Sequence, residues 1–317
     1  MRRLLSWLPS SSQVLGLDVT EEGVALVHTA LGKNSPQVLR TDFCTWSQEE
    51  ERAKTLSRKV REIARPRIPV VSTVSPQSYQ LLQVQAPKVK ESEMKMAVSW
   101  QIKDLIDIPL NQAVVDYFPA PDSPGLGKMV YVVAADREAV RQHADLLQQA
   151  RLKIRAIHIP ELALRNVVRQ EEGSESGLAL LHMEEESGMI LIFKNQVLYV
   201  ARRLSSGLNQ LLQSGPTQEN GLLETEDRGD SAFESVLLDL QRTLDYFESN
   251  FRSSPVGNLL LAPQLGDTPE LQSYLQQNMD LSVRLLDSQR LLGEDLSFAE
   301  QGRCLLALGS ALRAGEG

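Results

Sequence analysis

The sequence predicts an α/β protein built from two similar halves, with a smaller α/β unit inserted into the first half. A pair of apolar runs around a polar turn opens near Gln13, and the same pattern returns near Leu178, each time followed by further strand and helix patterns. Residues 78–153 read as strand, helix, strand, strand, helix, which indicates a compact insert. Two halves of this kind would face each other across a cleft.

The first half is expected to begin with a β-hairpin. Between Gln13 and Thr29 two apolar runs flank a polar turn, in which Gly23 supplies the flexible position. Asp18 ends the first run and is expected to point into the turn. A strand, an amphipathic helix and a buried strand are then predicted at 36–43, 48–64 and 70–74.

The insert is expected to contain a half-buried strand first and a helix that ends before Pro109. Its strands are predicted at 79–85, 113–119 and 129–135, and its helices at 92–106 and 137–150, the second capped by Asp136. Trp100 on the first helix leaves two interpretations open, a core residue or an exposed anchor for a partner. We favour the core, because aromatic side chains mainly bury apolar area.

The chain then returns to the first half and continues into the second. Pro160 is expected to begin a helix that ends near Arg169, since proline suits the first turn of a helix. In the second half strands are predicted at 178–183, 189–194, 196–202, 259–262 and 283–286, and helices at 233–250, from 269 onward and at 304–313. Residues 214–231 are polar and acidic and are expected to be mobile. The predicted domains are therefore 1–77 with 154–176, 78–153, and 177–317.

Composition excludes several classes of protein. The net charge of −8 argues against broad nucleic-acid binding, which needs clustered Lys and Arg. Cys44 and Cys304 lie far apart without metal-ligand spacing, which fits a reducing cytosol rather than a disulfide scaffold or a zinc site. The four histidines form no HExxH pattern, and no GxSxG is present, so no hydrolase motif is found.

No apolar run reaches the roughly 18 residues that a membrane-spanning helix needs. The first residues, MRRLLSWLPSSS, leave two interpretations open. A frayed terminus is favoured, because chain ends are often disordered. Alternatively, Arg2 and Arg3 would meet lipid head groups while the apolar residues enter the membrane surface.

Several segments together resemble a known family. LGLDVTEEGVALV (15–27) resembles the first phosphate loop of the actin, heat-shock chaperone and sugar-kinase superfamily, in particular its PilM and FtsA branch. The second loop and its strands are similar to 178–211, the long helix and next strand to 237–251 and 257–263, and the terminal helix to 302–313. The insert, 80–117 with 131–168, resembles the small extra subdomain of PilM. The chain thus resembles PilM-type assembly proteins of type IV pili in order from about residue 14 to 313, with the MshI group of mannose-sensitive haemagglutinin (MSHA) pili the most similar.

The resemblance implies an actin-like (ribonuclease H-like) fold and a cytoplasmic scaffold at the inner face of the bacterial inner membrane. In the PilM family a groove between the insert and the first half receives the cytosolic N-terminal tail of a PilN-type membrane protein. Other pilus assembly proteins are further implied partners, and membrane association would run through the partner. A basic tail would be attracted to a chain with a net charge of −8.

The three nucleotide loops depart from the pattern of the family. Asp18 is kept, but Val19 replaces a glycine and Glu21 and Glu22 follow it. In the second loop Met183 stands where Asp is typical and a glutamate stands where Gly is typical, and the third reads Ala262-Pro263-Gln264 in place of Gly-Gly. ATP with Mg²⁺ is therefore not expected as a cofactor, and turnover is expected still less. If a nucleotide binds, the resemblance implies Asp18, Thr20 and Ser187 as its contacts.

A metal site receives little support from the sequence. Glu184, Glu185 and Glu186 with Asp18 could gather Mg²⁺ or Ca²⁺, but consecutive carboxylates seldom converge on one ion and are typical of a solvated turn. We therefore expect no metal ligands and no catalytic residues.

Two functions compete with the scaffold. One is an ATP-driven conformational switch of the same machine. The other is a component similar to the cytoplasmic part of GspL of type II secretion, although GspL continues into a transmembrane helix and this sequence shows none before Gly317. Polymerisation, as in FtsA, has no indication in the sequence.

Overall fold

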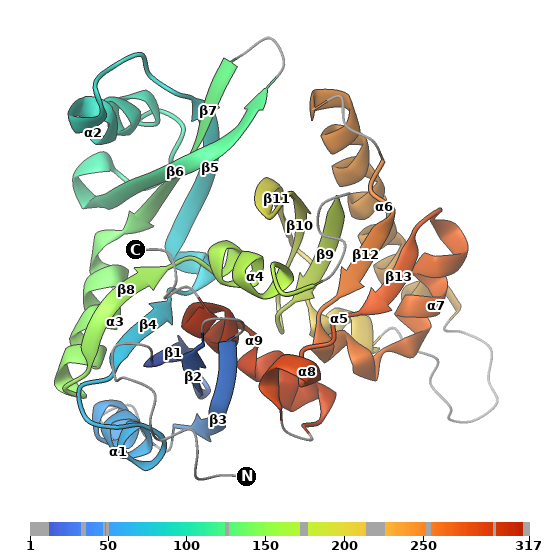
Figure 1. Cartoon of the computed structure of the whole chain (residues 1–317). Helices are drawn as coiled ribbons and strands as arrows, with labels where there is room; N and C mark the ends of the chain where they lie inside the picture. Colours follow the sequence, from blue (N-terminus) through green and yellow to red (C-terminus); the bar gives the residue numbers. More distant parts are fainter. Residues whose placement is uncertain are drawn as a thin grey trace.

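The computed structural model of the chain describes residues 13–312, apart from 33–35, 47, 49–50, 124–126, 172–176, 214–225, 252–254 and 294–295. The described strands form three sheets (Figure 1). Two of these have five strands and are called the first and the second sheet, and the third has three strands and is called the inserted sheet. The segment that contains Arg2, Arg3 and Trp7 lies outside the described residues.

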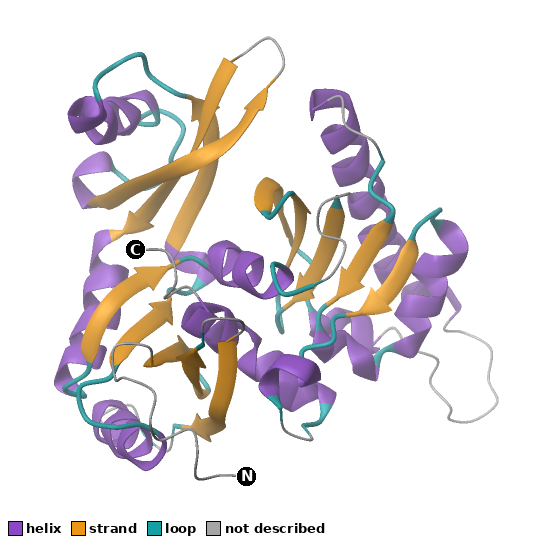
Figure 2. Ribbon diagram, in the orientation of Figure 1, coloured by secondary structure: helices purple, strands orange, loops and turns teal. Residues whose placement is uncertain are grey.

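The first sheet has the strand order β3-β2-β1-β4-β8. Its strands are β1 (Gln13–Val19), β2 (Gly23–Leu31), β3 (Pro36–Thr45), β4 (Pro69–Thr73) and β8 (Lys153–His158). β1 pairs antiparallel with β2 and parallel with β4, so the predicted hairpin is confirmed. Apolar runs such as β1 are buried on both faces because helices cover both sides of the sheet (Figure 2).

The second sheet repeats this topology with the order β11-β10-β9-β12-β13. Its strands are β9 (Leu178–Met183), β10 (Gly188–Lys194), β11 (Val197–Leu204), β12 (Asn258–Leu261) and β13 (Ser282–Leu285). β9 pairs antiparallel with β10 and parallel with β12, as β1 does with β2 and β4. Between β10 and β11, Asn195 and Gln196 have φ of 49° and 63°, the pattern of a two-residue hairpin turn. The predicted architecture of two similar α/β halves is confirmed.

Two helices lie between the two five-stranded sheets, α4 (Pro160–Val168) and α9 (Phe298–Leu312) (Figure 1). They share one apolar core with both sheets, which includes Ala25, Val27, Leu164, Leu180, Leu260, Leu305 and Leu308. A methyl group on Gly16 of β1 would lie 1.9 Å from the Ala307 carbonyl oxygen, and one on Gly309 would lie 2.1 Å from the Ala163 carbonyl oxygen. The backbone of α9 therefore contacts the backbones of β1 and α4 directly.

The outer faces of the two sheets carry the remaining long helices. α1 (Arg52–Ile63) and α3 (Arg137–Gln149) pack on the first sheet through Leu56, Val60 and Leu147. α6 (Glu226–Phe251) and α7 (Pro269–Asn278) pack on the second sheet. The sequence groups α3 with the insert, yet its Leu147 belongs to the apolar cluster of the first half. The prediction that Asp136 caps α3 is confirmed, since its carboxylate accepts the Ala139 N–H.

The inserted sheet has the order β5-β7-β6, with β5 (Tyr79–Gln85), β6 (Ala113–Ser123) and β7 (Gly127–Asp136). α2 (Glu91–Gln101) covers it through Val98 and Ile102, both completely buried. The interpretation of Trp100 as core is wrong, because 64% of it is exposed. The position explains this, since a residue two places from Val98 and Ile102 lies on the opposite side of a helix.

Several predicted helix bounds also need correction. α2 ends at Gln101 rather than at 106, because Asp107 leaves the helix to exchange hydrogen bonds with the Gln80 side chain of β5. α6 begins at Glu226 rather than at 233, while 214–225 lie outside the described residues. α1 begins at Arg52 rather than at 48, and α9 at Phe298 rather than at 304. The short helices α5 (Leu208–Gln213) and α8 (Gln289–Leu292) were not predicted from the sequence.

Within the described part of the chain, no helix combines the length and the apolar character needed to cross a membrane.

Candidate functional site

The turns after β1 and β9 occupy the carboxyl ends of equivalent strands in the two halves. Open α/β sheets bind ligands at this edge. The first turn carries Asp18 and Thr20, and the second carries Glu184 and Ser187. The two turns meet, because the Glu185 carboxyl group forms a hydrogen bond with Glu22. The structure thus brings together the regions of all three residues that the resemblance implies for a nucleotide.

Asp18 lies near the end of β1, beside the end of β4. Its carboxylate accepts a hydrogen bond from the Thr73 hydroxyl at 2.5 Å. Burial raises the pKa of Asp18 to about 6, and the Thr73 hydrogen bond opposes this shift. The half-buried side chain is therefore held beside the end of β4 by its neighbour.

Thr20 has its hydroxyl committed within its own turn. The Oγ1 atom accepts the Gly23 N–H at 3.2 Å and donates to the Gly23 carbonyl at 3.3 Å. The Thr20 N–H donates to the same carbonyl at 2.9 Å. Thr20 therefore stabilises the β1–β2 turn, and neither group is available to a ligand in this conformation.

Glu184 opens the turn between β9 and β10. Its carboxylate accepts the Ser187 hydroxyl at 3.2 Å, so the third implied contact residue is committed to Glu184. The pKa of Glu184 is raised to about 7, first by burial and then by the nearby Asp18 charge, while Ser187 and Arg203 act in the opposite direction. A carboxyl group that faces another carboxylate across the cleft carries a proton more readily than an ordinary glutamate.

The three consecutive glutamates have different partners, and only Glu185 and Glu186 are exposed. Glu185 bonds Glu22, and the pKa of Glu185 is raised, first by that hydrogen bond. The Glu186 carboxylate accepts the side-chain amide of Asn209 at 2.7 Å. Among the residues that the structure describes, no three His, Cys, Asp or Glu side chains are placed to hold a metal ion.

Three residues of the cleft were not found from the sequence. The Tyr79 hydroxyl donates to the carboxylate of Glu161, which lies in the first turn of α4. The Arg203 guanidinium of β11 lies 4.5 Å from the centre of the Tyr79 ring. Burial raises the pKa values of Tyr79 and Glu161, and the charge of Arg203 lowers both. We call Asp18, Glu161, Glu184 and Arg203 the cleft cluster, in which the Arg203 charge acts on the carboxyl groups of Glu161 and Glu184 and the Asp18 charge acts on Glu184.

The third loop, η6 (Pro263–Asp267), is fixed by its own side chain. The Gln264 amide donates to the Met183 carbonyl at 2.5 Å and lies 3.0 Å from Nδ1 of His182. On its other side it meets Gly302 of α9, where a methyl group would lie 2.8 Å from the Gln264 Cβ. Gln264 thus fills the space between β9 and α9.

A polyphosphate needs free backbone N–H groups and cations around it. The Glu184 N–H donates to the Ser187 carbonyl at 2.7 Å. The carbonyls of Glu184 and Glu185 accept the first N–H groups of α5, those of Leu208 and Asn209, at 2.7 and 3.0 Å. These three donors are therefore occupied in this conformation, and the carboxyl groups of Asp18 and Glu184 lie near each other beside them.

No protein-family model and no curated protein matches this chain. Several solved structures do match this chain. The chain is similar to a protein of the PilM–PilN type IV pilus biogenesis complex, with a TM-score of 0.72, 23% identity, and 96% of this chain and 99% of that chain covered. A Bacteroides thetaiotaomicron protein with an actin-like ATPase fold and unknown function matches at a TM-score of 0.50 and 13% identity, over 90% and 97% of the two chains.

The cytoplasmic domain of EpsL, an inner-membrane component of the type II secretion system of Vibrio cholerae, matches at a TM-score of 0.46, which is too low to support an argument. Its identity is 13%, over 79% of this chain and 82% of that chain. Because the first two matches cover nine tenths or more of the chain, the chain has the actin-like ATPase fold.

Proposed function

We propose that this protein is a scaffold of type IV pilus biogenesis, of the MSHA kind, at the cytoplasmic face of the inner membrane. In this proposal it binds the cytosolic tail of a PilN-type membrane protein and works without nucleotide turnover. The likeness to a protein of a PilM–PilN type IV pilus biogenesis complex supports it, together with the ordered sequence resemblance to PilM. Other pilus assembly proteins would join through the same scaffold.

The cleft cluster is the observation that carries the proposal. Asp18, Glu161 and Glu184 gather where an actin-type protein would hold phosphate, and the Arg203 charge acts on two of them, Glu161 and Glu184. Two carboxylates near a polyphosphate repel it by roughly 1 kcal/mol for each close pair of charges, even in water. A cleft of this kind favours a permanent structural role over cycles of nucleotide binding.

We expect no binding of Mg–ATP or Mg–ADP by the purified protein. A nucleotide at 100 times its Kd would stabilise the folded state by about 2.7 kcal/mol, which a thermal unfolding scan detects. Titration calorimetry and thermal unfolding at millimolar nucleotide, with MgCl₂ alone as the control, should show neither heat nor a raised Tm.

Micromolar affinity in that experiment would contradict the scaffold proposal and favour the alternative, an ATP-dependent switch. The placement of Asp18 at the end of β1 is the observation that favours this alternative. The switch further requires that Asp18→Ala abolish pilus assembly while the protein stays folded, whereas a scaffold tolerates the substitution.

The insert offers an apolar surface that suits a partner. Met96 and Trp100 of α2 are each 64% exposed, and Leu105 just beyond α2 is 56% exposed. Exposed apolar residues that gather on one element often mark an interaction site. We infer that the partner contacts this face of the insert.

Trp100→Ala with Leu105→Ala should weaken capture of the partner's cytosolic peptide by about tenfold or more, because buried tryptophans dominate binding energies. The Tm should change little, since both residues are exposed. Leu238→Ala, on α6 and 41% exposed, is the matched control and should bind the peptide normally. Fluorescence anisotropy with the labelled peptide measures both, and equal affinities for the double variant and the wild type would remove α2 from the partner surface.

A further inference from the structure

A strongly basic surface extends along α1 to the starts of β4 and β8. The segments 52–67 and 151–155 contain ten Lys and Arg and one acidic residue, Glu62, in a chain whose net charge is −8. Eight of the cations are exposed: Lys54, Arg58, Arg61, Arg65, Arg67, Arg151, Lys153 and Arg155. We call these eight residues the basic face.

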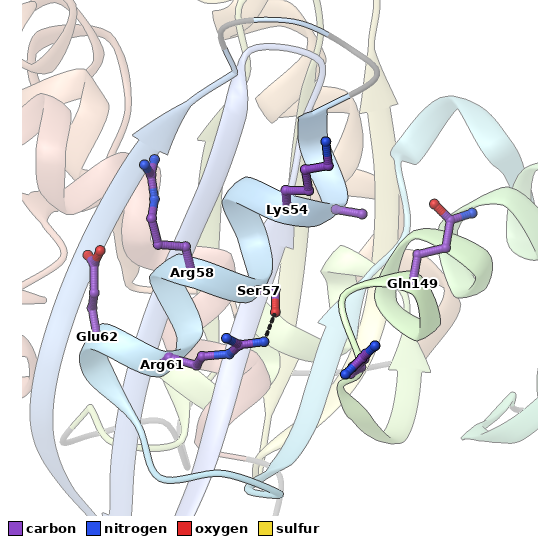
Figure 3. A pocket seen from close by; sticks show the side chains of 8 residues that line it. Lys54, Ser57, Arg58, Arg61, Glu62 and Gln149 are labelled. Carbon is purple, nitrogen blue, oxygen red and sulfur yellow. Dashed lines mark hydrogen bonds between the residues drawn. The ribbon is translucent and has the colours of Figure 1, made fainter.

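Part of the basic face surrounds an open groove of about 600 Å³ between α1 and the end of α3. Lys54, Arg58 and Arg61 occupy successive turns of α1, and Gln149 of α3 lies across the groove (Figure 3). Arg151 lines it as well. A groove lined by cations suits an anionic head group.

The acidic residue in these segments, Glu62, lines the groove and shares the Lys59 ammonium with Asp42. The Glu62 carboxylate lies 3.5 Å from the Lys59 ammonium, which also pairs with Asp42 at 3.1 Å. Within the described part of the chain, no carboxylate forms an ion pair with Lys54, Arg58, Arg61 or Arg151. The groove therefore keeps most of its positive charge.

Two arginines of the basic face adopt a backbone conformation that favours glycine. Arg67 follows Pro66 in a turn closed by the Ile68 N–H and the Arg65 carbonyl, and its φ is 65°. Glycine is the usual residue at that place, after a proline in a type II turn. Arg151 follows the last residues of α3 with a φ of 60°, where helices commonly end on glycine. Strained backbone of this kind tends to gather at functional sites.

Strand pairing places these two turns side by side. β4 and β8 are parallel, and Pro69 at the start of β4 lies opposite Lys153 at the start of β8. Each strained arginine precedes its strand by two residues. The fold therefore presents both arginines at one edge of the sheet, beside the end of α1.

The chain's first residues join the molecule at this same edge. Gln13 begins β1, and its side chain contacts Nε2 of His28 at 3.2 Å, while Nδ1 of His28 contacts the Ile63 carbonyl at 3.0 Å. The preceding residues include Arg2, Arg3, Leu4, Leu5, Trp7 and Leu8. A basic and apolar sequence of this kind is one that anionic membrane surfaces attract.

We propose that the basic face binds the anionic phospholipids of a membrane surface directly, with the groove between α1 and α3 receiving a lipid phosphate. The proposal accounts for Arg67 and Arg151. Their backbone conformation favours glycine, but their charges serve the contact with the membrane. The inference does not depend on the pilus partner proposed above.

The full chain should bind vesicles that contain about one third phosphatidylglycerol and should not bind vesicles of phosphatidylcholine alone. Raising the salt concentration should weaken the binding, because charges at a surface are screened. Arg67→Gly with Arg151→Gly should weaken vesicle binding by roughly tenfold or more. Its Tm should be no lower than that of the wild type, since glycine relieves the strain.

Lys88→Ser with Lys90→Ser is the matched control, because it removes two exposed cations from the insert and leaves the basic face intact. Flotation with vesicles should show that this control binds almost as the wild type does. The proposal is overturned if neither the wild type nor any variant binds phosphatidylglycerol vesicles. It is also overturned if the arginine variant and the lysine variant lose binding equally. Binding of soluble polyglutamate without any binding to vesicles would assign the face to an acidic protein instead and would also overturn it.

Discussion

Gly16→Ala should destabilise the protein by about 3 to 5 kcal/mol, the largest effect that we expect from a single methyl group in this chain. The new Cβ would lie 1.9 Å from the Ala307 carbonyl oxygen and 2.6 Å from the Ala311 nitrogen. Both are backbone atoms of α9, so no rotation of a side chain relieves the overlap. The helix itself must move away from β1, and it belongs to the core shared by both halves.

Thermal and urea unfolding measure this effect, and the Tm should fall by on the order of 10 °C. Gly257→Ala is the matched control, since no atom lies within 4 Å of its new methyl group. That control should stay within about 0.5 kcal/mol of the wild type or be slightly stabilised through its unfolded state. A Gly16→Ala variant as stable as Gly257→Ala would mean that α9 does not pack against β1.

The strand order of both halves could be predicted because its signal is local. The hairpins at Gln13 and Leu178 are readable as apolar runs around polar turns, and the buried strands after them are short apolar runs between turn signals. The position of α9 between the sheets could not be read. A helix rich in small residues indicates close packing, but only the structure pairs Gly16 with Ala307 and Gly309 with Ala163.

Some residues of the candidate site could likewise be predicted from the sequence, and others could not. Asp18, Thr20 and Ser187 were accessible because each lies in a loop whose sequence can be compared with a family pattern. Tyr79, Glu161 and Arg203 begin or end elements that are far apart in the chain, and they meet only after the halves pack. A glutamate directly after Pro160 at a helix start was the available signal for Glu161, but such a residue usually serves the helix dipole.

Trp100 shows where residue type misleads. Its size favoured the core, whereas the spacing of Val98 and Ile102 already placed it on the other side of α2. The periodicity of a helix therefore outweighs the average behaviour of an aromatic residue.

Glu184→Gln should stabilise the protein at pH 8 by about 2 kcal/mol and change little at pH 4.5. The pKa of Glu184 is about 7 in the folded state, above the ordinary value of 4.5. An acid with a raised pKa contributes stability that is fully present below its unfolded pKa and is lost as the pH rises through the folded one. Glutamine keeps the shape without the charge that Asp18 repels, so its advantage should appear between pH 4.5 and 7 and stay constant above.

The difference in Tm between the variant and the wild type, measured from pH 4.5 to 8, should grow to on the order of 4 °C. The Tm of the variant must be compared with that of the wild type because two histidines also make the stability depend on pH. Burial lowers the pKa values of His143 and His182 to about 4, so their contribution to stability changes with pH in the direction opposite to that of Glu184. Their neutral forms stabilise the fold above pH 6.5, and this contribution is lost as the pH falls toward 4 in both proteins alike. Glu186→Gln in the same turn, where the side chain is exposed, should show little change at any pH. A gain for Glu184→Gln that is independent of pH would mean that Glu184 and Asp18 do not share the cleft.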